Sequence, residues 1–165
     1  EGPPTYTSHI GGCRKVSIVT LGNVLTALGV KIPNGTANSA GALFAKATSA
    51  MGGANYAGRV RENMTVTTSQ ASSMYDVFAA AAPEIITAMA AATPLAQCAV
   101  GGVGAKLFDA AGTTCQIEGL SCLIGRPATQ AHVDICSYTI QHASDQTTGQ
   151  RIAVASILAA NYTCE

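Results

Sequence analysis

The sequence has few charges, few aromatic side chains and no tryptophan. Charged residues make up 11% of its 165 positions, whereas an ordinary soluble domain carries roughly 25%. Nine basic side chains balance nine acidic ones. Because lysine and arginine are not in excess, the chain cannot neutralise many phosphates, and we expect no nucleic-acid partner. The balance equally disfavours an acidic partner or an anionic membrane surface.

The sequence also lacks any C-x-x-C pair, which excludes the common zinc, thioredoxin and c-type haem signatures. Its six cysteines are Cys13, Cys98, Cys115, Cys122, Cys136 and Cys164. An even number of scattered cysteines predicts disulfides and an oxidising compartment. The sequence alone does not fix their pairing. A local loop closed by Cys115 and Cys122, and a link between Cys13 and Cys164 near the two ends, are two hypotheses.

The start of the chain and three glycosylation sequons point to the same compartment. Residues 1–12 predict an extended N-terminal arm, followed by a single domain over residues 13–165. The arm has neither a basic start nor an apolar signal core, so we expect a processed chain. N-x-S/T sequons begin at Asn34, Asn63 and Asn161 and are candidate glycan sites. Together with the cysteines they predict a secreted glycoprotein.

Hydrophobic periodicity predicts an all-α, disulfide-stapled fold of about five to six short helices. The helical patterns cover residues 13–28, 39–51, 73–81, 83–93, 127–142 and 149–161, with a short helix near 105–111. Gly29 is placed to end the first helix, Ser39 to cap the second, and Pro83 to begin the fourth. Residues 52–71 predict an irregular connection with at most one short strand, and residues 115–122 predict a loop.

Three segments leave alternatives open. The alternation of Ala131, Val133 and Ile135 would also suit a strand. The run 85–105 has no charge and is long enough to cross a bilayer, but its Pro, Gln, Thr and Gly content favours a buried helix pair over an integral membrane protein. The last helix is apolar on two faces, which predicts burial or a contact with a partner.

No catalytic or metal-binding set stands out. His132 and Cys136 could share one helix face and bind a metal if Cys136 were a free thiolate, but a disulfide is the favoured interpretation. A triad built from Asp134, His142 and a serine has no nucleophile motif to support it. Glu84 and Glu118 are available for glycoside chemistry, yet aromatic platforms for a sugar are few. The Gly-rich stretch 101–104 lacks the spacing of a phosphate loop.

Low charge and small side chains predict function better than any motif does. A neutral surface with apolar patches promotes association, so the leading hypothesis is a secreted, non-enzymatic subunit that assembles into a homo-oligomer, filament or scaffold. The alternative is an extracellular carrier of an apolar molecule held between Ala-rich helices. A lipid, sterol or pigment would suit such a site. So would a haem-like ring, for which His9, His132 and His142 are candidate ligands.

Overall fold

A computed structural model describes residues 14–33, 36–91, 93–100 and 103–163. Within these ranges the chain forms six α-helices and one short antiparallel pair of strands. The predicted all-α class is therefore confirmed. The predicted arm over residues 1–12 and the hypothetical Cys13–Cys164 link lie outside the described residues.

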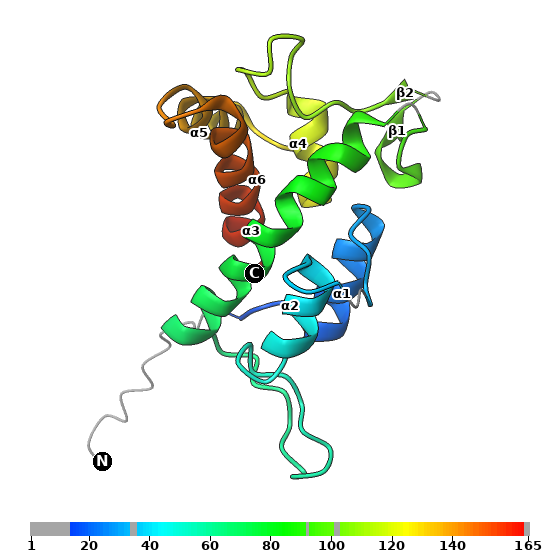
Figure 1. The fold of residues 1–165 in the computed structure, drawn as a ribbon, viewed down its shortest axis with the longest axis vertical. Helices are drawn as coiled ribbons and strands as arrows, with labels where there is room; N and C mark the ends of the chain where they lie inside the picture. The colour runs from blue at the N-terminus through cyan, green and yellow to red at the C-terminus, as the bar shows by residue number, and fades with distance from the viewer. Residues whose placement is uncertain (1–13, 34–35, 92, 101–102, 164–165) are drawn as a thin grey trace, which may run out of the picture.

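The elements follow one another around one long central helix (Figure 1). They are α1 (Ile18–Ala27), α2 (Ala40–Ala47), α3 (Thr68–Ala90), the 3-10 turn η1 (Ala96–Cys98), β1 (Ala99–Val100), β2 (Val103–Gly104), α4 (Ile117–Ile124), α5 (Gln130–Gln141) and α6 (Gln146–Tyr162). The two strands pair with Ala99 opposite Gly104. Helices α2 and α6 both pack against α3, and α5 packs against α6.

Short polar side chains begin most of the helices. Ser17, Ser39, Thr67 and Asp145 each accept a hydrogen bond from a backbone N–H three residues further on, which satisfies a donor that the helix itself leaves unpaired. The predicted cap at Ser39 is thus confirmed. Gly29 follows α1 with a φ of +92°, a conformation that favours glycine, as the sequence predicts.

The prediction of two helices separated at Pro83 is wrong, because α3 runs unbroken through that residue. A proline inside a helix removes one backbone hydrogen bond and costs about 3 kcal/mol. Ala82 and Ile85, on either side of it, are completely buried. We infer that their burial in the core offsets the lost bond and keeps the helix continuous.

Two further predictions fail between η1 and α5. Residues 105–111 form an irregular segment instead of a short helix, and the expected loop over residues 115–122 contains α4. Glycine explains why α4 fits there, because a Cβ at Gly119 would collide with the backbone of Lys106 and Leu107. Glycine is a poor helix former, so the local sequence pattern around Gly119 does not predict a helix. The packing role of this glycine cannot be seen in that pattern.

The core lies between α3 and the helices around it. Its largest fully buried apolar side chains are Leu21, Leu25, Met51, Met74, Phe78, Ile85, Leu120, Leu123 and Leu158. Gly149 brings α6 close to α5, since a Cβ there would lie 2.9 Å from the Cα of Ile140. The last helix buries one apolar face through Val154, Ile157 and Leu158, whereas Ile152 on its other face remains 40% exposed. Burial within the chain therefore accounts for only part of its two-faced character.

Disulfides tie α4 to its two neighbours. Cys98 at the end of η1 bonds to Cys122 in α4, and Cys115 just before α4 bonds to Cys136 in α5. The hypothetical Cys115–Cys122 pair is therefore wrong. The pair does not form because Cys122 lies in α4, a turn and a half from the start of that helix, and faces η1. Cys115 precedes the helix and faces α5.

A β-hairpin projects from the end of the molecule opposite α5 (Figure 1). We call residues 54–62 the hairpin. Asn55 and Val60 exchange two backbone hydrogen bonds of 2.9 Å, and the Asn55 side chain accepts a third from the N–H of Gly58. The segment 52–71, predicted to be irregular, therefore contains an ordered turn, and its last four residues belong to α3 instead.

A buried ion pair anchors the base of the hairpin. Lys15 is completely buried, and its Nζ lies 2.6 Å from Oε1 of Glu62. The same carboxylate oxygen accepts a 2.7 Å hydrogen bond from the N–H of Ile18, in the first turn of α1. Glu62 therefore joins the hairpin to the segment that leads into α1.

Candidate functional site

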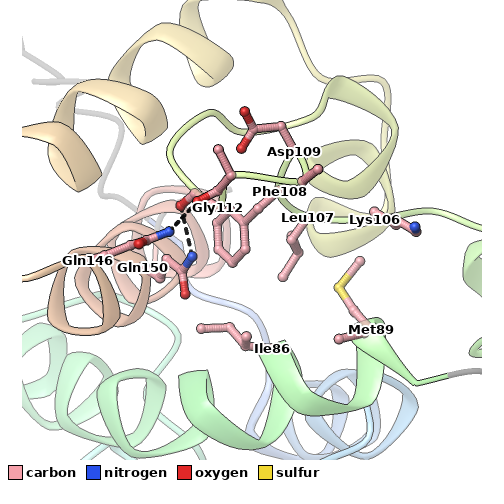
Figure 2. Close-up of a pocket in the computed structure, with 12 residues that line it drawn as sticks. Ile86, Met89, Lys106, Leu107, Phe108, Asp109, Gly112, Gln146 and Gln150 are labelled. Carbon is pink, nitrogen blue, oxygen red and sulfur yellow. Dashed lines mark hydrogen bonds between the residues drawn. The ribbon is translucent and has the colours of Figure 1, made fainter.

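A cleft of about 370 Å³ opens between α3, the segment 106–112 and the start of α6 (Figure 2). Ile86 and Met89 of α3, with Leu107 and Phe108 of the segment, give it an apolar interior. Lys106 and Asp109 are the charged residues that line it. Small-molecule sites usually have this size and this mixture of apolar walls with a few polar groups.

Two glutamines of α6 hold one wall of the cleft in place. Nε2 of Gln146 donates a 2.6 Å hydrogen bond to the carbonyl of Ala111, and Nε2 of Gln150 donates a 2.8 Å bond to the carbonyl of Gly112. Gly112 has a φ of +72°, and an added Cβ would collide with the Gln146 amide. The wall is therefore fixed before any ligand arrives.

Asp109 is used to shape the loop that closes this wall. Its Oδ1 accepts hydrogen bonds from the N–H groups of Thr113, at 2.9 Å, and Thr114, at 3.1 Å. The apolar walls of the cleft suit binding of an apolar molecule.

The histidines predicted as possible ligands lie away from this cleft, on α5. Nδ1 of His132 lies 3.1 Å from the N–H of Thr129 and completes a capping box. The ring of His142 stacks on Tyr138, with centroids 3.9 Å apart, and its Nδ1 lies 2.9 Å from the Tyr138 carbonyl. The third candidate, His9, is outside the described residues.

The hypothetical metal pair of His132 and Cys136 does not exist, because Cys136 is oxidised in a disulfide. No cluster of three or more His, Cys, Asp or Glu side chains suitable for a metal occurs in the described parts of the chain. Asp134 accepts a 2.8 Å hydrogen bond from Gln130 on its own helix. Glu84 accepts one from the N–H of Lys31, and Glu118 is exposed on α4.

The sequons differ in how available their amides are. Asn63 is exposed, and its side-chain oxygen accepts a hydrogen bond from the N–H of Thr65. Asn161 is half-buried in the last turn of α6, where its Nδ2 donates a 3.0 Å hydrogen bond to the carbonyl of Ile124. Asn34 lies outside the described residues. A glycan is therefore compatible with Asn63 and incompatible with the observed bond of Asn161.

Exposed apolar side chains gather on one side of α5. Ile135 is 60% exposed and Tyr138 63% exposed, and helical spacing places them on one arc with Asp134 and His142. We call these four residues the α5 face. Helix α5 contains no lysine or arginine, so the face is apolar with one negative charge.

The hairpin is the second exposed apolar feature. Tyr56 is 91% exposed and Val60 58% exposed, beside the exposed side chains of Arg59 and Arg61. The sequence shows these arginines as a local charge cluster, but the turn that presents them was not predicted. The Asn at position 55 and the Gly at position 58 were the available signal, since both favour turns.

Among the described residues, two titrating groups have shifted pKa values, and both lie around α6. The backbone N–H of Thr148 donates to the Asp145 carboxylate, at 2.8 Å, and this bond lowers the pKa of that group. Burial raises the pKa of the Tyr162 hydroxyl, which donates to the Leu123 carbonyl. Both groups serve the attachment of α6 and lie outside the cleft.

No protein-family profile matches the chain, and no curated protein or solved structure is similar to it. Among the described residues, no helix has the length and apolar character needed to span a membrane. The two described disulfides are of the kind that persist in oxidising compartments. The functional conclusion therefore depends on the surface and the cleft alone.

Proposed function

We propose that this protein is a secreted, non-enzymatic subunit that associates with copies of itself. The observation that carries the proposal is the α5 face, where Ile135 and Tyr138 are both about three-fifths exposed, one turn apart on an ordered helix. Contiguous exposed apolar residues rimmed by polar ones are typical of protein interfaces. The neutral net charge leaves little repulsion between copies.

Sedimentation velocity over a broad range of concentration tests this proposal. We expect the sedimentation coefficient to rise with concentration as copies associate. Tyr138→Ser should weaken the association about 30-fold or more, because it removes the large aromatic side chain from the contact. Tyr75→Ser is the matched control, since Tyr75 is also partly exposed, on α3. A wild-type protein that stays monomeric throughout contradicts the proposal.

Secretion is supported by the disulfides and by the exposed sequon at Asn63. Expression in a eukaryotic secretory pathway tests it. We expect export into the medium and glycan mass at Asn63, removed by Asn63→Gln, with none at Asn161. Export that fails while the protein folds normally contradicts this part of the proposal.

A second candidate function is transport of an apolar molecule, which the cleft between α3 and α6 favours. Its volume of about 370 Å³ lies within the usual range for small ligands. Native mass spectrometry of protein from its source, compared with the denatured mass, would show a bound molecule as a mass difference. Ala111→Trp should fill the cleft and abolish binding, whereas Ala50→Trp, at an exposed site outside the cleft, should not.

A further inference from the structure

We infer that the hairpin of one copy docks on the α5 face of the next copy, so that the chains join head to tail. This inference rests on the proposed self-association and names the two surfaces that meet. It follows from the shape of the hairpin, from the charges of the two surfaces and from their positions on the molecule.

The hairpin is preorganised to enter a partner. Its backbone bonds between Asn55 and Val60 fix the turn, and the buried Lys15–Glu62 pair fixes its base. A rigid element loses little conformational freedom on binding, which favours affinity. Tyrosine and arginine are, with tryptophan, the residue types enriched among those that dominate binding energy, and this turn exposes Tyr56 with two arginines.

The two surfaces are complementary in charge and in apolar character. Arg59 and Arg61 give the hairpin two positive charges, because its carboxylate, Glu62, is paired with Lys15. The α5 face carries one carboxylate, Asp134, on a helix without lysine or arginine. Opposite charges steer such contacts and fix their orientation.

The hairpin also has room for a side chain from the α5 face. Residues 54–56 and 59–62 line a hollow of about 470 Å³, bordered by Tyr56, Arg59 and Val60. We assign this hollow to Tyr138 of the next copy. An arginine over its ring would add a cation–π contact, and Ile135 would lie against Tyr56 or Val60.

The positions of the two surfaces decide the type of assembly. Figure 1 shows the hairpin and α5 at opposite ends of the molecule. A contact between different surfaces at opposite ends is heterologous, and it leaves a free hairpin and a free α5 face on every pair. Copies can therefore continue to add, and the product is a ring or a filament.

Mixing two single-surface variants tests the inference. Tyr56→Ser removes the hairpin contact, and Tyr138→Ser removes the face contact, and both side chains are exposed enough for the fold to tolerate the change. Circular dichroism and the melting temperature confirm that each variant is folded. Protein made without glycans removes any shielding by a sugar at Asn63.

Each variant alone should associate more weakly than the wild type by a factor of about 30 or more. An equimolar mixture should form a one-to-one heterodimer and stop there, because one copy supplies an intact hairpin and the other an intact face. Tyr75→Ser should assemble as the wild type does. Arg59→Glu should weaken assembly as well, and pairing it with Asp134→Arg should restore it in part.

The outcomes separate the inference from the proposed function. A wild-type protein that never associates overturns both. If the wild-type protein associates and the variants associate equally well, the inference is overturned, but the proposed self-association still stands. If both variants are monomeric and their mixture gives no heterodimer, the inference is also overturned. Each surface is then needed for association, but the two surfaces do not bind each other.

Discussion

Replacing Glu62 by glutamine removes the charge that Lys15 depends on while keeping the size of the side chain. In the wild-type protein the Lys15 ammonium is completely buried, 2.6 Å from the carboxylate. After the change, the carbonyl of Val16, 3.4 Å from Nζ, would remain as an acceptor beside the neutral amide. Among the described residues, the buried cation would then have no ion-pair partner.

The expected loss follows from the burial of the pair. Removing one partner of a buried ion pair costs about 3–5 kcal/mol. Glu62 keeps 19% exposure of its side chain, so solvent screens part of the effect, and the amide oxygen can still accept from Ile18. We therefore expect Glu62→Gln to lower the free energy of unfolding by about 3 kcal/mol, the lower end of that range.

Urea denaturation followed by circular dichroism measures this loss. Lys15→Met in the Glu62→Gln background should recover much of it, because the uncompensated charge is gone. Glu118→Gln is the control, since Glu118 is exposed on α4 and surface changes stay within about 0.5 kcal/mol. If Glu62→Gln also costs less than about 0.5 kcal/mol, the pair does not hold the base of the hairpin as described.

Three further predictions concern α6. Gly149→Ala should lower stability by about 1–2 kcal/mol in a thermal melt, because crowding against the backbone of Ile140, 2.9 Å away, outweighs the gain in helix propensity; a more stable variant contradicts the close contact. The Thr148 N–H lowers the pKa of Asp145. The Asp145 carboxylate therefore stabilises the fold above the ordinary aspartate pKa, and this stabilisation is lost as the pH falls through the lowered pKa of the folded state. Asp145→Ala should accordingly flatten the acid limb of a stability–pH curve. Because burial raises the pKa of Tyr162, stability should be lost as pH rises through that folded pKa, and an unchanged alkaline limb in Tyr162→Phe would contradict this.

The sequence predicts those helices whose signals are local. The Ser39 cap, the Gly29 stop and the apolar spacing of α1 each depend on residues within a few positions of one another. Pro83 breaks the same local rules, yet α3 continues because Ile85 and its neighbours are buried by distant parts of the chain. Periodicity contains no information about that burial.

The candidate surfaces were predictable only in part. Low charge and small side chains lead to association as a hypothesis, but they do not locate a surface. Ile135 and Tyr138 look like a buried stripe in the pattern, and the structure exposes both because Cys136 and Ile140 turn the opposite side of α5 inward. The cleft wall around Gly112 also arises from contacts with α6 that are distant in sequence.

The order of the two described disulfides has a consequence for how the chain oxidises. Cys98–Cys122 and Cys115–Cys136 interleave along the chain, whereas Cys115 and Cys122 are close neighbours. In an unfolded chain, closing that shorter loop is favoured by about 1 kcal/mol over either native loop. The first bond to form is therefore expected to be a non-native one, which must then be exchanged through an attacking thiolate. Maturation of this protein should accordingly depend on a disulfide isomerase rather than on an oxidant alone.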